Sequence, residues 1–548
     1  MIAYTCKYTP IELFAGFGEA PKRLNPTVHA FSEADRLSHR NLCSFARALL
    51  QACREHGIKN LVLTSCCDSL RRVGDVLSAA APDSFVFMLD LPRADGPCAR
   101  QRYAAELHRL IDACSVWFGV PFDLQKCLAA FAPAEPTGQT DHLTLLGARS
   151  NPALLQMLRQ ELPLPVEDRT CVGNRGLQVP PAGQTLDQFL LWYAGALLQQ
   201  IPCMRMTNAA PRRQLLEDPY VKGILYHTIQ FCDYYGFEYA DLQKQTHLPL
   251  LKLSTDGTDG AEEQLRTRVQ AFAESLHAVV PKKRTMTAKT STGYYAAGID
   301  SGSTSTNVVI LDEHRKMIGS SIVPTGAHAA RSADAALQQA LLRAGISREQ
   351  LADVVTTGYG RAYIGAGGHD VTEITCHARG AHFLNPSVRT IIDIGGQDSK
   401  AIRLDEDGNV RSFVMNDKCA AGTGRFLEMM AHALELSMDE MSVCGLHWKE
   451  NIVISSMCTV FAESEVVSLV AQNKQTADIV HGLNVSVAVK AAALAARVDP
   501  QPRFMMTGGV ASNRGVVKAL EEKLGAPLLV LPEHQLCGAL GAALIAFD

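Results

Sequence analysis

Short apolar runs alternate with amphipathic stretches along the first half of the chain. Runs with the length and composition of buried strands lie at 60–65 (NLVLTS), 84–89 (SFVFML), from His142 onward (HLTLLG) and at 223–227 (GILYH). Residues 42–55 and 186–198 have helical spacing of apolar positions. Strands that alternate with helices predict parallel α/β sheets.

A basic segment rich in Thr and Ser, PKKRTMTAKTSTGYY, lacks any apolar periodicity and is typical of a linker. We expect it to separate two halves of the chain, and a length of 548 residues predicts three or four compact units. The division predicted is an α/β subdomain at 1–140, a second at 141–280, the linker at 281–294, and a C-terminal domain at 295–548.

Composition narrows the class of protein. The chain is 47% hydrophobic and 20% charged, as in globular proteins, and its net charge of −4 gives no reason to expect nucleic acid or an anionic membrane as partner. We see no apolar run of the ~18 residues that a membrane helix needs and no signal peptide at the start, so we expect a cytoplasmic protein. The 16 cysteines are unusual, and without a secretion signal they indicate metal or redox ligands.

Two glycine-rich hairpins and a late glycine turn stand out in the second half. In each hairpin an apolar strand ends in Asp, Asp300 in GIDSGSTST and Asp393 in DIGGQDSK, and a small polar tip follows. Such tips offer backbone N–H groups to phosphate, and the carboxylates suit hydrated Mg²⁺. The candidate nucleotide contacts are Gly302, Ser303, Thr304, Ser305, Thr306, Gly395, Gly396, Lys400, Gly508 and Gly509. A Walker A loop is absent, and the order of the turns resembles the actin/Hsp70/sugar-kinase ATPase superfold.

Two cysteines of the second half each precede a predicted helix. Cys419 lies in NDKCAAGTGRFLE and Cys458 in SSMCTVFAESE. The positive end of a helix dipole favours thiolate. Two thiolates are too few for a [4Fe–4S] cluster, but a twofold dimer would supply four. Two buried structural cysteines are the alternative.

The motifs around these residues closely resemble the ATP-dependent activators of 2-hydroxyacyl-CoA dehydratases and benzoyl-CoA reductases. They lie at 298–306, 356–361, 373–381, 393–400, 416–428, 458–465 and 508–513. The resemblance implies a homodimer with one [4Fe–4S] cluster held between subunits by Cys419 and Cys458, together with ATP and Mg²⁺ at the hairpins. In this interpretation Asp300 and Asp393 organise Mg²⁺ and water, and Gln397 and Asp398 orient the attacking water. Asn307 departs from the family, in which many members carry Lys.

The cysteine-rich first half resembles, more loosely, the cluster-bearing component of the 2-hydroxyacyl-CoA dehydratases. The family's three cluster cysteines fall on Cys43, Cys67 and Cys232, and three thiolates leave one iron open. Adding Cys66, Cys171 and Cys203 gives six thiols, as in double-cubane proteins with an [8Fe–9S] cluster. Three and six ligands both stay open. Cys6, Cys53, Cys98, Cys114 and Cys127 are interpreted as core thiols.

The expected fold is therefore a pair of Rossmann-like α/β subdomains followed by a two-lobed actin-like ATPase. The expected function is ATP-dependent, low-potential electron transfer from the interfacial cluster to a cluster in the first half, which activates 2-hydroxyacyl-CoA dehydration. Reduced ferredoxin or flavodoxin would be the donor, under anoxic conditions, and a further dehydratase subunit is a candidate partner. The alternatives are a double-cubane-type reductase of small molecules, a nucleotide-regulated redox sensor, and a sugar-kinase-like phosphotransferase.

Overall fold

The chain divides into two units, Met1–Val269 and Gln270–Asp548, each with its own sheets and core. The computed structural model describes residues 1–132, 140–173, 175–208, 210–258, 262–277, 294–361, 364, 369–416, 421–454 and 459–547. The predicted linker at 281–294 lies outside these residues except for its last position. The finer domain boundaries stay predictions.

The first unit contains two four-stranded sheets with the same strand order. The strands are β1 (Ile2–Tyr4), β2 (Pro21–Arg23), β3 (Asn60–Thr64), β4 (Phe85–Leu89), β5 (His142–Gly147), β6 (Val166–Asp168), β7 (Val221–Ile229) and β8 (Leu250–Thr255). Their orders are β2-β1-β3-β4 and β6-β5-β7-β8, and every pair is parallel. In each sheet the order reverses beside its first strand. Such a switch point is where open α/β sheets bind ligands, at the carboxyl ends of the strands.

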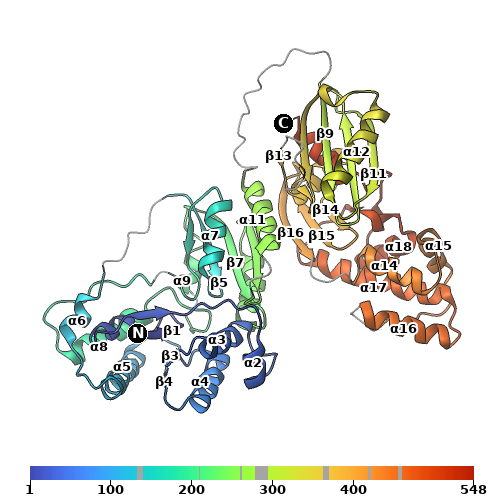
Figure 1. Ribbon diagram of the computed structural model, residues 1–548. Coiled ribbons are helices and arrows are strands. Elements are labelled where there is room, and N and C mark those ends of the chain that lie inside the picture. The colour runs from blue at the N-terminus through green and yellow to red at the C-terminus, as the bar shows by residue number, and fades with distance from the viewer. Residues whose placement is uncertain are drawn as a thin grey trace. The chain divides into compact units, whose positions relative to one another are not determined.

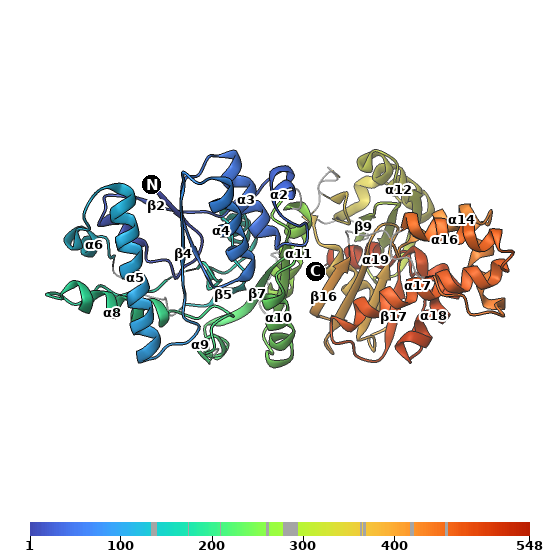
Figure 2. The same cartoon turned by 90° about the horizontal axis from the view of Figure 1, so that it is seen from below.

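Helices connect these strands and cover the sheets. They are α1 (Ile11–Ala15), α2 (Ser32–Leu37), α3 (Ser44–Glu55), α4 (Asp68–Ala80), α5 (Pro97–Phe118), α6 (Leu124–Ala129), α7 (Pro152–Glu161), α8 (Leu186–Leu198), α9 (Ala210–Gln214), α10 (Asp233–Gln245) and α11 (Glu262–His277), the last of which crosses into the second unit. Figures 1 and 2 show α3 and α4 on one side of the first sheet and α5 and α8 on the other. The predicted parallel α/β class is therefore confirmed.

The second unit repeats one arrangement twice. Its strands are β9 (Tyr295–Ser301), β10 (Ser305–Leu311), β11 (Met317–Pro324), β12 (Leu351–Thr357), β13 (His369–Asp370), β14 (Thr390–Ile394), β15 (Ser399–Leu404), β16 (Val410–Asn416), β17 (Phe504–Thr507) and β18 (Leu528–Leu529). The sheets are ordered β11-β10-β9-β12-β13 and β16-β15-β14-β17-β18. Each begins with an antiparallel meander of three strands and continues with parallel strands. These two lobes form the actin-like fold that was expected.

Helices join and flank the two lobes. They are α12 (Ala329–Ala344), α13 (Glu373–Leu384), α14 (Gly424–Ala433), α15 (Met438–Cys444), α16 (Thr459–Ala471), α17 (Thr476–Ala496), α18 (Arg514–Leu524) and α19 (Cys537–Ile545), with 3₁₀ turns at Arg348–Gln350, Gly445–His447 and Gly509–Ser512. Helices α13 and α19 pack so closely that a side chain at Gly541 would meet the carbonyl of Cys376.

One helix in the described part of the chain, α17, is long and apolar enough to cross a membrane by length and composition. Its most apolar stretch has a mean hydropathy of 1.6, and 56% of that stretch is buried inside the protein. Ile479, Leu483 and Val487 are fully buried in the core of the second unit. These contacts are those of a core helix.

Candidate functional site

The two predicted hairpins have the same local structure. In β9–β10 the N–H of Gly302 donates to the carbonyl of Ser305 at 3.0 Å, and in β14–β15 the N–H of Gly395 donates to the carbonyl of Asp398 at 3.0 Å. The aspartates that precede these tips are both buried. In register, Asp300 lies opposite Asn307 and Asp393 opposite Lys400. The hairpins therefore present their tips and their carboxylates together.

Both hairpins line one cavity of about 400 Å³, which we call the hairpin cavity. Nine of the ten predicted nucleotide contacts line it: Gly302, Ser303, Thr304, Ser305, Gly395, Gly396, Lys400, Gly508 and Gly509. The tenth, Thr306, is fully buried with its hydroxyl 2.7 Å from that of Thr325 and is not part of the lining. Of the predicted catalytic residues, Asp300, Asp393 and Asp398 line the cavity. Gln397 is exposed and does not line it.

Gly508 shows why a glycine turn closes this cavity. Its φ is +85°, and a side chain there would lie 2.4 Å from the carbonyl of Ile394 and 2.8 Å from a carboxylate oxygen of Asp393. Only glycine tolerates both the backbone conformation and this close approach. The third glycine turn thus packs directly on the second hairpin.

Lys400 gathers three carboxylates in the floor of the hairpin cavity. Its ammonium lies 2.7 Å from Asp398, 3.2 Å from Asp393 and 3.3 Å from Glu373, and all four side chains are buried. Burial disfavours the charged lysine, but Asp398, Glu373 and Asp393 raise its pKa well above the ordinary value. One cation faces three carboxyl groups. This excess of carboxyl oxygen fits a Mg²⁺ ion, whose preferred ligands are oxygens.

Two residues of this floor, Glu373 and His377, were not among the predicted site residues. They lie one turn apart on α13, and the His377 ring reaches 3.7 Å from Asp393 and 4.0 Å from Asp300. Burial raises the pKa of Glu373 to about 8, partly offset by Lys400, and burial also raises that of Asp300. For Asp393 burial is outweighed by His377 and Lys400, which lower its pKa. The motif EITCHARGA carries the i, i+4 signal for this pair.

Helix α14 begins on the tip of the second hairpin. The N–H of Gly424 donates to the carbonyl of Gly395 at 2.9 Å, and the N–H of Arg425 donates to that of Gly396 at 2.8 Å. Gly424, Leu427 and Glu428 also line the hairpin cavity. The hairpin tip and the first turn of α14 are therefore mechanically joined.

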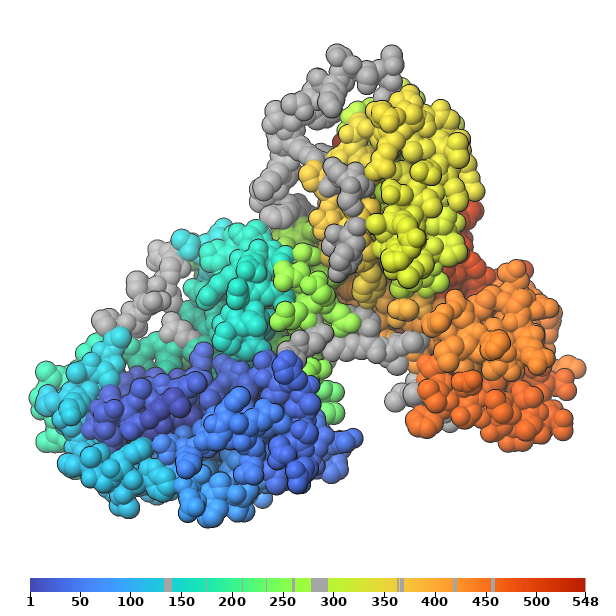
Figure 3. Space-filling view, in the orientation of Figure 1, coloured from blue at the N-terminus to red at the C-terminus, as the bar shows by residue number. Residues whose placement is uncertain are grey.

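Cys419 and Cys458 lie outside the described residues. Helix α16 begins at Thr459, the position after Cys458, and α14 begins five positions after Cys419. Helix α16 leaves large apolar side chains exposed: Val460 (63%), Phe461 (66%), Val467 (56%) and Val470 (48%). Figure 3 shows this part of the second unit in orange at the surface.

In the first unit the predicted thiols meet at one place, although they are far apart in sequence. A cavity between the two sheets, which we call the thiol cavity, is lined by Cys6, Cys43, Cys66, Cys67, Cys171, Cys203 and Cys232. Cys6 and Cys66 follow β1 and β3, the strands at the switch point of the first sheet, and Cys232 follows β7 at the switch point of the second. All six predicted cysteines of this half are brought together.

The three cysteines that carry the family resemblance share one structural position. Cys43, Cys67 and Cys232 are the N-cap residues of α3, α4 and α10, each at least 12 residues long. The Cys67 sulfur accepts the N–H of Leu70 at 3.4 Å. Helix N-termini stabilise thiolate through their free N–H groups and dipole.

Arg205 brings a positive charge to these sulfurs. Its guanidinium donates to the Cys66 sulfur at 3.8 Å and to the Cys232 sulfur at 4.0 Å, and it lies 4.7 Å above the ring of Tyr234. A hydrogen bond from Cys232 lowers the pKa of Cys43, and Arg205 adds to this effect. The thiols and this guanidinium fit an iron–sulfur cluster, because such clusters are held by thiolates and tuned by hydrogen bonds to sulfur.

No three Cys, His, Asp or Glu side chains within the described ranges converge on a point where one metal ion would sit.

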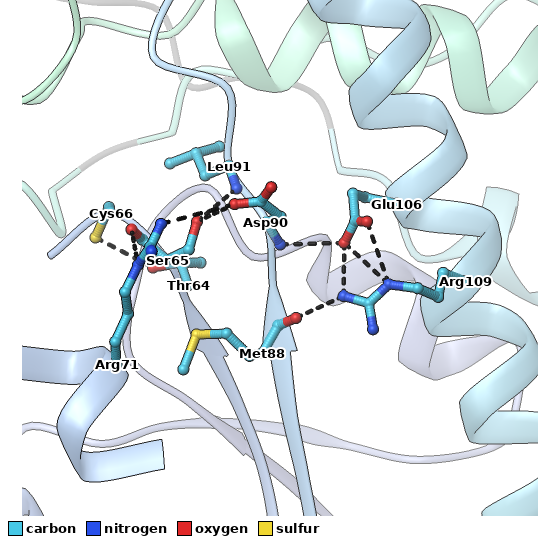
Figure 4. A network of polar contacts seen from close by, with 9 residues as sticks. All are labelled: Thr64, Ser65, Cys66, Arg71, Met88, Asp90, Leu91, Glu106 and Arg109. Atoms are coloured by element: carbon cyan, nitrogen blue, oxygen red, sulfur yellow. Dashed lines mark hydrogen bonds and ion pairs between the residues drawn. The ribbon is translucent and has the colours of Figure 1, made fainter. Parts of the chain in front are cut away.

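The loop that carries Cys66 is fixed by a polar network (Figure 4). The Ser65 hydroxyl donates to Asp90 at 2.6 Å, and the Arg71 guanidinium donates to the Ser65 carbonyl at 3.1 Å. The Thr64 hydroxyl lies 3.3 Å from the Cys66 sulfur. Arg71 thus holds the loop backbone.

The interpretation as core thiols is wrong for two cysteines, Cys6 and Cys98. Cys6 lines the thiol cavity, because the short strand β1 ends at Tyr4 and directs the chain into the switch point. Cys98 is exposed in the first turn of α5. Cys53, Cys114 and Cys127 are buried away from the cavity, as predicted.

Comparison with protein families also divides the chain into two parts. Residues 297–546 match the BadF/BadG/BcrA/BcrD ATPase family, and residues 6–137 and 145–276 match the D-component of 2-hydroxyglutaryl-CoA dehydratase.

Individual relatives are activators of dehydratases, in agreement with the ATPase match. The activator of lactoyl-CoA dehydratase from Anaerotignum propionicum is 46% identical over 254 residues, which are 46% of this chain and 98% of that protein. The (R)-2-hydroxyglutaryl-CoA dehydratase activating ATPase of Acidaminococcus fermentans is 44% identical over 254 residues, or 46% of this chain and 97% of that protein. A solved structure, the activator of the 2-hydroxyisocaproyl-CoA dehydratase from Clostridium difficile with bound ADPNP, is 42% identical, covers 46% of this chain and 94% of its own, and has a TM-score of 0.45.

Proposed function

Because the chain belongs to the BadF/BadG/BcrA/BcrD ATPase family and carries a dehydratase D-component-like half in front of the ATPase, we propose that it is an activator fused to its own electron acceptor. ATP hydrolysis in the second unit drives low-potential electron transfer to the first. This electron transfer activates the dehydration of a 2-hydroxyacyl-CoA, which the first unit carries out together with a further dehydratase subunit. The observation that carries this proposal is the convergence of the predicted thiols on the thiol cavity.

The hairpin cavity supplies the residues for ATP hydrolysis in this proposal. Asp300 and Asp393 hold Mg²⁺, Lys400 keeps Asp393 and Asp398 oriented, and Asp398 positions water for attack on the terminal phosphate. The other predicted contacts that line the cavity receive the phosphates on their N–H groups. Gln397 stays a candidate only for a closed form, since its side chain is exposed in this one.

Helix α14 offers a route from ATP to the electron-carrying site. Its first two N–H groups are bonded to the hairpin tip, so closure of the lobes around nucleotide moves the helix that follows Cys419. When bound, an iron–sulfur cluster accepts and releases single electrons. Cys419 and Cys458 of two subunits would hold one between them, and the exposed apolar side chains of α16 support this homodimer.

The cellular setting follows from the chemistry. A cluster at a subunit interface is open to oxygen, so we place the protein in an anoxic cytoplasm, with reduced ferredoxin or flavodoxin as donor. The net charge of −4 agrees with a partner that is neither nucleic acid nor an anionic membrane.

A second candidate function is an ATP-driven, double-cubane-type reductase of small molecules. It is favoured by one observation, which is that Cys66, Cys171 and Cys203 line the same cavity as the three family cysteines. A dehydratase cluster with an open iron needs only three thiolates.

Iron and sulfide quantitation of the anaerobically purified full chain tests both candidates. About 12 iron atoms per dimer would mean one cubane in each first unit besides the bridging cluster, and about 20 would mean eight irons in each. The Cys419→Ala variant should lose only the bridging four. Iron-free protein with full activity would contradict the redox function.

A further inference from the structure

The thiol cavity is lined by seven cysteines, one more than a double cubane uses and four more than a three-thiolate cluster uses. Cys6 is partly buried, and its thiol hydrogen-bonds the thiol of Cys66. The two residues follow neighbouring parallel strands, with Tyr4 of β1 in register with Val62 of β3. The fold therefore places them side by side at one edge of the sheet.

The seven thiols fall into two groups by position. The helical group consists of the three helix N-cap residues Cys43, Cys67 and Cys232. The loop group consists of the four cysteines that lie on loops, Cys6, Cys66, Cys171 and Cys203. Within the loop group, Cys203 lies 3.0 Å from the hydroxyl of Tyr235, and the same hydroxyl bonds Cys171. Cys203 is further tied to the segment after Cys6, because its N–H donates to the hydroxyl of Tyr8 at 3.2 Å.

Positive charge accompanies both groups, from the buried Lys7 and the partly buried Arg205. Lys7 is 3% exposed and donates to the carbonyl of Ile201 at 2.6 Å. Its ammonium interacts electrostatically with Cys203, Cys171 and Cys6. Among the residues that the structure describes, neither Lys7 nor Arg205 forms an ion pair with a carboxylate. A buried cation without an anion is costly. Thiolates in both groups would supply the missing negative charge.

We propose that Cys6 is an iron ligand, and that the loop group of four thiols holds a closed [4Fe–4S] cluster while the helical group of three holds a second cluster with one open iron. Four thiolates satisfy all four irons of a cubane, and three leave one free. A double cubane bridged by sulfide uses six thiols and would leave one unligated beside the cluster. The inference rests on the proposed function, in which the first unit carries iron and sulfide.

The test compares Cys6→Ala with Cys53→Ala, in full-length protein that also carries Cys419→Ala to remove the bridging cluster. Cys53 is a matched control, because it is buried on α3 away from the cavity. Iron and sulfide are measured per chain, and mild ferricyanide oxidation followed by EPR counts the [3Fe–4S] clusters that open cubanes leave. The ATPase rate reports whether the second unit is folded, and a Cys6→Ser variant, which keeps the size of the side chain, separates loss of the thiol from loss of packing in the first.

We expect about eight irons and eight sulfides per chain and one [3Fe–4S] signal in the control. Cys6→Ala should either double that signal, because the closed cluster becomes open, or halve the iron, because the cluster is lost. Unchanged iron and an unchanged signal in Cys6→Ala would overturn the inference, as would a ninth sulfide in the control. A control that carries no iron would instead contradict the proposed function.

Discussion

At the scale of single residues, charge decides what each cavity can hold. In the hairpin cavity Lys400 faces three carboxyl groups, and in the thiol cavity Arg205 faces sulfur atoms. The first arrangement leaves room for a cation, and the second calls for anionic sulfur. The carboxylates of the hairpin cavity therefore suit a Mg²⁺ ion, and the guanidinium in the thiol cavity suits iron bound by anionic thiolates.

Arg205 is predicted to raise the reduction potential of the cluster proposed for the thiol cavity. Its positive charge and its N–H···S hydrogen bonds stabilise the more negative, reduced state. Arg205→Met should lower the midpoint potential by about 60 mV or more, equivalent to one tenfold change for a one-electron couple. An EPR-monitored redox titration measures this, with Arg205→Lys as the charge-conserving control. A potential that is the same in Met and Lys variants would contradict the role.

Asp398 is predicted to act in hydrolysis rather than in nucleotide binding. Asp398→Asn removes the charge that orients water, so ATP turnover should fall by about 100-fold or more while ATP still binds. The control is Asp334→Asn, an exposed aspartate whose partner is Arg348. Steady-state phosphate release and equilibrium binding of nucleotide separate the two effects. Equal loss of binding and turnover would point to a structural role instead.

At the scale of elements, the apolar pattern located many secondary structures well. The helix predicted at 186–198 is α8 with the same bounds, and the strands predicted at 60–65 and 84–89 are β3 and β4 within one residue. Both Asp-Gly hairpins were recognisable because turn chemistry is local. The pattern could not reveal Cys6 as a cavity residue, since β1 has only three residues, nor Glu373 and His377, which reach the cavity through packing between the lobes.

The α16 helix is predicted to form the subunit interface. Phe461 is 66% exposed, other apolar side chains of α16 are also exposed, and Phe461 follows Cys458 by three positions in the sequence. Phe461→Glu should convert dimers to monomers and remove the bridging cluster, because desolvating the carboxylate disfavours association. Light scattering and iron content check this, and Leu342→Glu on α12, at a site 81% exposed, is the control. A dimer that persists in Phe461→Glu would place the interface elsewhere.

At the scale of the whole molecule, two units that match different protein families occupy one chain. The ATPase match ends at residue 546 and the dehydratase-like match at 276, so the two account for most of the sequence. Cysteines separated by nearly 230 positions meet in the first unit, a result of its two repeated sheets. Sequence motifs identified the two halves, whereas the convergence of seven thiols required the fold.

ATP-dependent reduction of the first unit would show most directly that the chain joins an activator to its own electron acceptor. Anaerobic full-length protein is reduced through its bridging cluster, mixed with Mg²⁺–ATP or with Mg²⁺–ADPNP, frozen, and examined by EPR. With ATP the signal of the bridging cluster should decay and that of the thiol-cavity cluster should appear, and Asp398→Asn should abolish this transfer. Equal transfer with and without hydrolysable nucleotide would contradict the proposed function.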